Sequence, residues 1–316
     1  MPHLLSPLQL KSVQLKNRIV ASLPHSQRSS AGKAGHFHLM EYARQAENGS
    51  GLVLTETAAV EPEGRKSSQD LGIWSDDHLP GLQKMVQLAL GQGAVPGIRI
   101  GHAGITLPAD QKKWLPPCER LVAPLDFKPE DLTRMVQRFG EASFRAAKAG
   151  FQALELQANE GDLMHQMLSG LLNHRTDAYG GDFANRTRFL KQVVHEVKKN
   201  WPNQLPLALR LAATDYSDCQ ESWQLTDALS LTRELGKMGI DVIIPSGGGL
   251  NGDAIRNTPA NYQVSLSWAI RKQGYTHTGT LGVPIELTQA NRVVSQEMAD
   301  LVVVADASFQ LPAYTE

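Results

Sequence analysis

The sequence has few cysteines and no excess of one charge. Cys118 and Cys219 are the only two cysteines among 316 residues, and they lie far apart without the spacing of metal ligands. This usage predicts two reduced thiols rather than a disulfide framework. The 31 Lys and Arg residues nearly balance the 32 Asp and Glu residues, which gives a net charge of -1. Such a mixed surface gives no electrostatic reason to expect a nucleic-acid or membrane-surface partner.

Long apolar segments are also absent. No run approaches the roughly 18 consecutive apolar residues of a membrane span. Residues 1–10 lack the basic start and the apolar run of a signal peptide. The histidines do not have acids at the spacing of a zinc site, so no metal is expected. These absences predict a soluble, cytoplasmic protein.

Short apolar runs do recur, each followed by a longer amphipathic segment. Several, such as GLVLTE and DVIIPS, are apolar on both faces, as in parallel strands covered by helices. Eight such runs in one chain predict a (β/α)8 TIM barrel that forms a single domain over residues 1–316. The predicted strands are 18–22, 51–56, 95–101, 153–157, 207–212, 241–246, 276–282 and 301–305.

The clearest predicted helix is 129–149. Leu132, Met135 and Phe139 share one stripe of this segment, and Pro129 lies near its start. Segments 185–200, 225–238 and 262–273 have similar patterns. A doubly wound sheet is the alternative fold, but it would need a glycine-rich phosphate turn after the first strand, where the sequence reads ASLPHSQ.

A barrel places its functional residues at the carboxyl ends of the strands and in the loops that follow. Polar residues and glycines concentrate there. The candidates are Ser22, Pro24, His25, Thr57, Arg99, His102, Gln157, Glu160, Arg210, Gly248, Gly249, Gly282, Ala305 and Asp306.

Several motifs give the chain a family resemblance. GHAG (101–104), NHRTDAYGGDFANRTRF (173–189), LRLAATDYSD (209–218) and NYQV (261–264) follow an opening segment LLSPLQLKSVQLKNRIVAS. In this order and spacing the sequence resembles the old yellow enzyme family, in its bacterial thermophilic-like branch. The resemblance implies FMN as cofactor, NAD(P)H as reductant, and hydride transfer to the alkene of an α,β-unsaturated carbonyl compound.

The resemblance also implies roles for individual residues. Arg210 matches the arginine beside the flavin ring. Ser22 and Pro24 match the loop under the ring, and Tyr179 matches a tyrosine near the substrate. Three glycines keep backbone amides open to a phosphate: Gly248, Gly249 and Gly282.

The residues that would bind the substrate depart from the family pattern. Gln157 and Glu160 stand where the family has two hydrogen-bond donors to the substrate oxygen. An amide still donates, but an ionised carboxylate only accepts and would repel a developing enolate. Asp162 stands in place of a family tyrosine. We therefore predict that reduction of simple enones is impaired.

The residues that would bind the flavin also depart from the family pattern. Arg99 replaces a glutamine that pairs with the ring, and Thr57 replaces an alanine. Ala305 and Asp306 stand where the family has Gly-Arg at the phosphate, so a cationic anchor has become an anion. His25 replaces a redox-tuning cysteine. These changes predict weak FMN binding.

Three hypotheses remain open. The chain is a divergent flavin oxidoreductase, a flavin-free barrel for acid–base chemistry with Glu160, His102 and His25, or a silent binding subunit. Its ligand would be a small, anionic molecule held between Arg99 and Arg210, and homo-oligomerisation stays open. Alternatively, charged side chains fill the emptied cavity themselves. The set predicted to point toward it is Arg99, Arg210, Glu160, Asp215 and Asp306.

Overall fold

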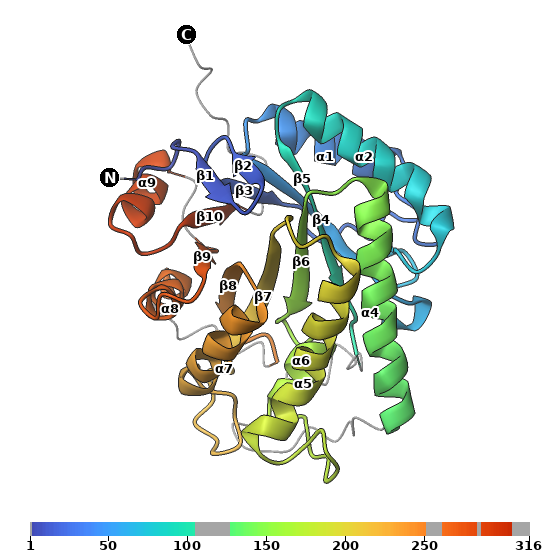
Figure 1. Cartoon of the computed structure of the whole chain (residues 1–316), viewed down its shortest axis with the longest axis vertical. Helices are drawn as coiled ribbons and strands as arrows, with labels where there is room; N and C mark the ends of the chain where they lie inside the picture. Colours follow the sequence, from blue (N-terminus) through green and yellow to red (C-terminus); the bar gives the residue numbers. More distant parts are fainter. Residues whose placement is uncertain (1, 105–126, 251–260, 283–285, 305–316) are drawn as a thin grey trace.

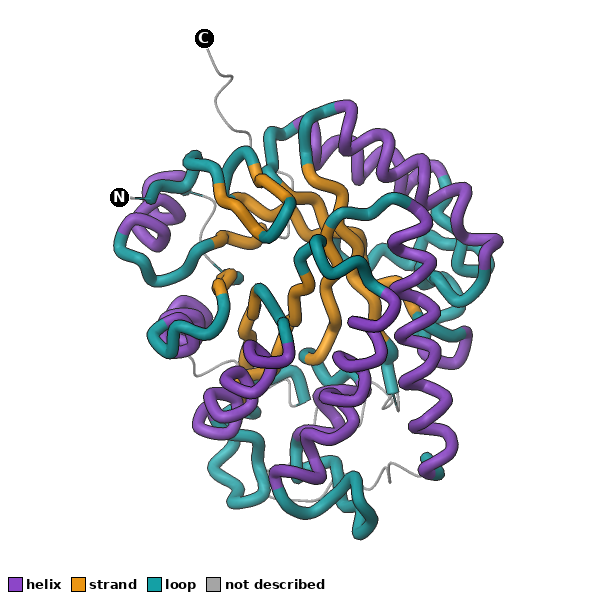
Figure 2. The backbone as a smooth tube through the Cα atoms, in the orientation of Figure 1, coloured by secondary structure: helices purple, strands orange, loops and turns teal. Residues whose placement is uncertain are grey.

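A computed structural model of the chain describes residues 2–104, 127–250, 261–282 and 286–304. Its centre is a closed barrel of parallel strands in the order β10-β3-β4-β5-β6-β7-β8-β9 (Figure 1). Helices surround the strands on the outside (Figure 2). The predicted (β/α)8 fold is therefore confirmed. The candidate residues Ala305 and Asp306 lie outside the described residues.

The barrel strands overlap all eight predicted segments. They are β3 (Ile19–Ser22), β4 (Leu52–Ala59), β5 (Val95–Gly101), β6 (Ala153–Ala158), β7 (Leu207–Thr214), β8 (Val242–Gly247), β9 (His277–Thr280) and β10 (Leu301–Val304). Strands β4 and β7 run further than predicted. The pairing of β4 with β5 has a register irregularity between Leu54 and Thr57, and the pairing of β7 with β8 has one between Ala212 and Thr214.

The helices are α1 (His36–Glu47), α2 (Leu79–Gly91), α4 (Pro129–Ala149), α5 (Leu163–Leu168), α6 (Phe183–Asn200), α7 (Leu225–Met238), α8 (Tyr262–Arg271) and α9 (Leu287–Ser295). Two short 3-10 turns, η1 (Pro62–Gly64) and η2 (Asp76–His78), precede α2. Helix α4 has the predicted bounds. Glu130 and Asp131 lie in its first turn, and Gly150 ends it with a φ of 97° that suits glycine.

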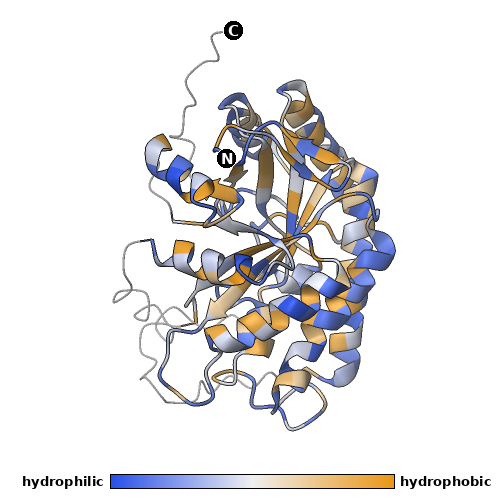
Figure 3. Cartoon of the chain, turned by 60° about the vertical axis from the view of Figure 1, so that its left-hand side comes forward, coloured by the Kyte–Doolittle hydropathy of each residue, from blue (hydrophilic) through white to orange (hydrophobic). Residues whose placement is uncertain are grey.

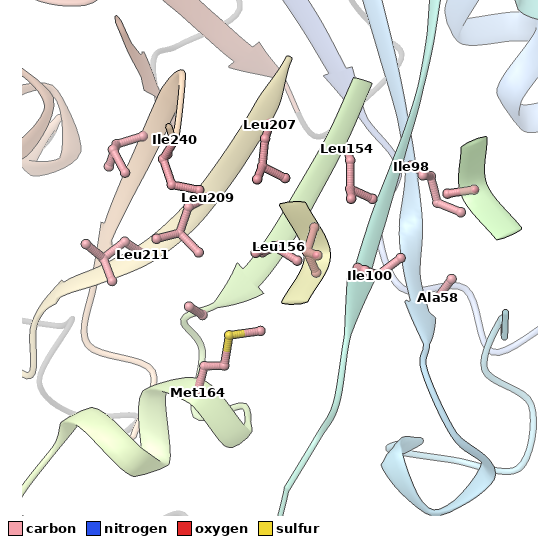
Figure 4. Packing of buried hydrophobic residues seen from close by; sticks show 14 of the residues in the cluster. Ala58, Ile98, Ile100, Leu154, Leu156, Met164, Leu207, Leu209, Leu211 and Ile240 are labelled. Carbon is pink, nitrogen blue, oxygen red and sulfur yellow. The ribbon is translucent and has the colours of Figure 1, made fainter. Parts of the chain in front are cut away.

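The outward faces of the strands form the layer under the helices. Leu154 and Leu156 of β6 lie beside Ile98 and Ile100 of β5, and Met164 of α5 belongs to the same buried cluster (Figure 4). In Figure 3 the barrel strands are mostly hydrophobic, whereas the helices alternate between hydrophobic and hydrophilic faces. This pattern is expected of helices that bury one side against a sheet.

The lower half of the barrel interior, at the amino ends of the strands, is apolar. A hairpin of β1 (Leu8–Leu10) and β2 (Val13–Leu15) packs into it. The inward side chains there form one buried cluster with the hairpin: Val20, Leu52, Leu54, Val95, Ala153, Val242, Ile244, Leu301 and Val303. Because side chains two residues apart share a face of a strand, the next inward positions form the upper half of the interior.

Candidate functional site

The upper half of the interior contains an ion cluster, which we call the floor cluster: Arg99 of β5, Glu155 of β6, Arg210 of β7 and Ser22 of β3. Arg99 and Glu155 are register partners, and Gln157 is the partner of Arg210. Arg99 Nε donates to Glu155 Oε1 at 2.6 Å, and Arg210 Nε donates to the same oxygen at 2.8 Å. All four floor residues are buried.

Both arginines also reach across the barrel to Ser22. Their Nη2 atoms donate to Ser22 Oγ, at 3.3 Å in the case of Arg210. Neither Nη1 has a hydrogen-bond partner within the described part of the chain. Two guanidinium groups and one carboxylate leave a net positive charge, so the floor cluster favours an anionic or electron-rich ligand above it.

The charged groups of the floor cluster shift one another's pKa values. Burial raises the pKa of Glu155, but the charges of Arg210 and Arg99 outweigh it and leave that pKa below its usual value. Burial and the charge of Arg99 lower the pKa of Arg210. Glu155 is therefore an ionised counterion on which both arginines depend.

A cavity of about 440 Å³ lies above the floor cluster at the mouth of the barrel. It brings together most of the predicted site residues. Its lining includes Ser22, Pro24, His25, Thr57, Arg99, His102, Gln157, Glu160, Arg210 and Gly282. The carboxyl ends of separate strands meet here, as the barrel fold requires.

Three predicted residues lie outside this lining: Tyr179, Gly248 and Gly249. The Tyr179 hydroxyl donates to Gln192 Oε1 of α6 at 3.1 Å, and the Arg175 guanidinium lies over its ring at 5.9 Å. Tyr179 therefore packs between the loop and a helix in this structure.

The prediction that Asp215 points toward the cavity is wrong. Asp215 is buried and accepts hydrogen bonds from His165 Nε2 at 2.8 Å, from Ser169 Oγ at 2.6 Å and from the Trp223 amide at 2.6 Å. Its carboxylate thus joins the loop after β7 to helix α5. Sequence position alone places Asp215 after β7 but does not say which way its side chain turns.

Glu160 occupies a tight turn between β6 and α5. Its φ is 55° and that of Gly161 is 74°, so both adopt left-handed conformations. The Gly161 amide donates to His165 Nδ1 at 3.1 Å. Because His165 also contacts Asp215, the buried His165–Asp215 pair holds the turn that carries Glu160.

At the rim of the cavity, the side chain of His25 lies between the carboxylates of Asp70 and Glu56. His25 Nε2 lies 3.0 Å from Asp70 Oδ1, and His25 Nδ1 lies 4.0 Å from Glu56 Oε2. The hydrogen bond with Asp70 raises the pKa of His25, although partial burial opposes it. Glu56 also accepts from the Ser26 amide at 2.5 Å and lies 2.7 Å from His38 Nε2, which anchors the first loop.

A second rim pair joins Lys66 to Asp162 at 2.6 Å. Burial raises the pKa of Asp162, and Lys66 opposes the shift only in part. Burial lowers the pKa of Lys66, but Asp162 and then Glu160 outweigh it and raise that pKa. The carboxylates of Glu160 and Asp162 therefore both interact electrostatically with the Lys66 ammonium.

His102 lines the cavity, but its ring nitrogens are engaged. Nδ1 accepts from the Gly104 amide at 2.9 Å, which leaves Nε2 to donate to Glu61 Oε1 at 2.9 Å. In this arrangement His102 ties the end of β5 to the loop before η1. It has no free ring nitrogen for a ligand.

Sequence reasoning missed Glu155, Lys66 and Asp70. A signal for Glu155 was present, since LELQ places two polar residues at alternate positions of an otherwise apolar strand. Lys66 and Asp70 lie in a loop with no periodic signal. Within the described ranges no group of three His, Cys, Asp or Glu could hold a metal ion, and no helix is long and apolar enough to cross a membrane.

Comparison with known proteins agrees with this geometry. The model of the NADH:flavin oxidoreductase / NADH oxidase family matches residues 3–315. The NADPH dehydrogenase of Bacillus velezensis is 37% identical over 308 residues, which span 96% of this chain and 90% of that protein. The chain belongs to this family.

Two solved structures show that other proteins share the fold of this chain. Morphinone reductase in complex with tetrahydroNAD superposes with a TM-score of 0.77 at 22% identity, over 96% of this chain and 87% of that one. The old yellow enzyme homologue from Zymomonas mobilis superposes with a TM-score of 0.78 at 21% identity, over 96% and 88%. The match to the family model and the 37% identity to the NADPH dehydrogenase confirm the predicted membership of the old yellow enzyme family.

The family implies flavin and nicotinamide cofactors. The donor set of the floor cluster fits a flavin ring, whose pyrimidine edge offers carbonyl oxygens and a ring nitrogen as acceptors. The unpartnered Nη1 groups of Arg99 and Arg210 can donate to such atoms. The buried Gln157 Oε1, which has no partner among the described residues, leaves a polar group of this cavity free for a ligand. The hydrogen-bonding groups at the floor of the cavity therefore match, in chemical type, those of a flavin ring.

Proposed function

We propose that this family member is a divergent NAD(P)H-dependent flavin oxidoreductase that binds FMN weakly and reduces strongly activated alkenes in preference to simple enones. The observation that carries the proposal is the floor cluster, a buried pair of arginines with one shared carboxylate at the mouth of the barrel. Its net positive charge would stabilise an anionic, reduced ring. When bound, the flavin supplies the hydride.

The residues of the chain then have separate tasks. Arg210 donates to the acceptor edge of the ring, and Arg99 adds positive charge beneath it. Gln157, at the end of β6, donates its amide N–H to the substrate oxygen. Glu160 disfavours negative charge on that oxygen, because a carboxylate beside a developing enolate is repulsive.

Weak FMN binding has two causes in this proposal. Arg99 already uses Nη2 on Ser22 and Nε on Glu155, and it has no acceptor for a ring N–H. Asp306, by the family resemblance, stands where a phosphate-binding arginine is expected. Like charges a few ångströms apart repel by about 4 kcal/mol at an effective dielectric constant of about 20.

The test is NADPH oxidation with saturating FMN and two acceptors, a maleimide and cyclohexenone. The maleimide carries two carbonyl groups, so its reduction depends less on one oxygen donor. We expect FMN-dependent oxidation with the maleimide and a rate lower by about 100-fold or more with cyclohexenone, the usual effect of losing an oxyanion donor. NADPH oxidation that does not respond to FMN with either acceptor would contradict the proposal.

A second candidate is a flavin-free barrel that binds a small anionic molecule. It is favoured by one observation: Glu155 and Ser22 already cross-link the floor cluster, and among the described residues Glu155 is the one carboxylate that pairs with its two guanidinium groups. The cytoplasmic location and a homo-oligomeric state remain predictions from the sequence.

A further inference from the structure

Two polar groups in the cavity lack partners within the described residues. Gln157 is 2% exposed and its side chain makes no hydrogen bond. Glu160 lines the same cavity, is exposed and makes no hydrogen bond or ion pair. Leaving a buried amide unpaired costs about 1–3 kcal/mol. Gln157 is therefore placed to bond a ligand, and Glu160 is placed to act on the same ligand.

The backbone turn at Glu160 is held in place by its neighbours. The left-handed φ of 55° is unfavourable for a residue with a side chain. The hydrogen bond from the Gly161 amide to His165 supports this turn. Gly249 packs against it so closely that a Cβ there would lie 2.7 Å from the Glu160 Cα. A turn held on both sides fixes the point from which the Glu160 side chain extends into the lining of the cavity.

Two cations, Lys66 and Arg210, line the same cavity as this carboxylate and interact with it electrostatically. Asp162 and then Glu160 raise the pKa of Lys66 against the effect of burial. Burial and Arg99 lower the pKa of Arg210, and the charges of Glu155 and Glu160 oppose that shift. Asp162 holds the Lys66 ammonium at 2.6 Å. The same cations stabilise negative charge on a ligand bound between the floor cluster and the rim.

The other candidate bases in the lining are engaged. His102 uses both ring nitrogens, on Glu61 and on the Gly104 amide. His25 contacts Asp70 at 3.0 Å, and Asp162 contacts Lys66. Among the described lining residues that could accept a proton, Glu160 is the one without a partner.

The charge on Glu160 decides which chemistry suits this arrangement. Hydride addition to an enone leaves Glu160 ionised beside a new enolate, which is repulsive. Proton abstraction neutralises Glu160 as the enolate forms, so the repulsion disappears in the same step. A free carboxylate beside an amide donor therefore favours proton transfer next to a carbonyl group.

We propose that this cavity catalyses a flavin-independent proton transfer, the shift of a β,γ-unsaturated ketone into conjugation, with Glu160 as base and Gln157 as the donor to the ketone oxygen. The Glu160 carboxylate takes the proton from the carbon between the carbonyl group and the alkene. The C–H electron pair enters the dienolate, whose oxygen accepts from Gln157. The Glu160 carboxylic acid then returns the proton to the γ-carbon, so no oxidant or reductant is consumed.

The test uses the full chain freed of flavin by dialysis, with 3-cyclohexen-1-one as probe. The conjugated product is followed by its ultraviolet absorbance, and deuterium uptake at the γ-carbon is followed by NMR in D₂O. We expect saturable isomerisation above the buffer rate. General base catalysis by a positioned side chain contributes about 10²–10⁴-fold, so Glu160→Gln should lose at least about 100-fold.

Glu160→Asn is the second variant, because asparagine tolerates the left-handed turn and keeps the fold. It should lose activity as Glu160→Gln does. Glu63→Gln is the matched control, since Glu63 is an exposed carboxylate of η1 outside the cavity lining, and it should keep the parent rate. Circular dichroism confirms that each variant is folded.

Isomerisation no faster than in buffer, or folded Glu160 variants as active as the parent, would overturn this proposal. Neither result bears on the flavin oxidoreductase proposal, which is measured with FMN and NADPH. Conversely, a protein that fails to use FMN can still isomerise the probe.

Discussion

The two halves of the barrel interior are built from the same strands but in opposite ways. The lower half holds an apolar cluster around Ile244 and Leu54, closed by the β1–β2 hairpin. The upper half, two residues further along the same faces, holds the floor cluster of Arg99, Glu155, Arg210 and Ser22. On β6, for example, the apolar Ala153 and the charged Glu155 are only two residues apart.

The difference shows how this barrel separates folding from chemistry. Apolar burial is non-directional and tolerates small changes in shape. A buried ion cluster is different, because each charge depends on a specific partner. The lower half therefore stabilises the barrel, whereas the upper half keeps unsatisfied donors, a net charge and a free carboxylate at the mouth.

The largest expected effect is in the upper half, at the shared counterion. Glu155→Gln leaves two buried guanidinium groups without a carboxylate. Removing one partner of a buried ion pair costs about 3–5 kcal/mol of unfolding free energy. Chemical denaturation at pH 7 measures this, with Ile244→Val in the lower half as a control that should cost about 0.5–1.5 kcal/mol. If Glu155→Gln costs no more than the control, the floor cluster does not depend on Glu155.

A core truncation in the lower half should affect stability but not the site. Leu54 is 2% exposed in the apolar cluster, and Leu54→Ala should cost about 2–5 kcal/mol of unfolding free energy. Ligand binding at the mouth should be unchanged under conditions where the variant is folded. A change in ligand affinity of more than tenfold would show that the two halves are coupled.

The smallest expected effect concerns the rim, and it depends on pH. The hydrogen bond with Asp70 raises the pKa of His25 above 6.5. Its stabilisation is therefore complete below pH 6.5 and is lost as the pH rises through the raised pKa. His25→Gln should lower the urea midpoint at pH 6 and leave it nearly unchanged at pH 9.

The size of this pH effect should be below about 1 kcal/mol, because the pair is partly exposed. His36→Gln is the control, since His36 is an exposed residue at the start of α1. An effect of His25→Gln that is equal at both pH values would contradict the role of the Asp70 hydrogen bond.

The fold was predictable because strand and helix periods alternate clearly in the sequence. All eight barrel strands and the bounds of α4 follow from apolar periodicity alone. The cavity lining was largely predictable too, since a barrel brings its strand ends together. Individual side-chain directions were not. Asp215 turns toward His165 rather than the cavity, and the partners of Lys66 and His25 come from loops without a sequence period.

The most direct test of the account is the flavin content of the gently purified protein. We predict no stoichiometric FMN absorbance and weak binding on titration. The substitutions Arg99→Gln and Asp306→Arg together should tighten FMN binding by about 100-fold, which corresponds to about 2.7 kcal/mol. Arg292→Gln, an exposed arginine of α9, is the control and should change nothing. A yellow protein that retains one tightly bound FMN per chain would contradict the account.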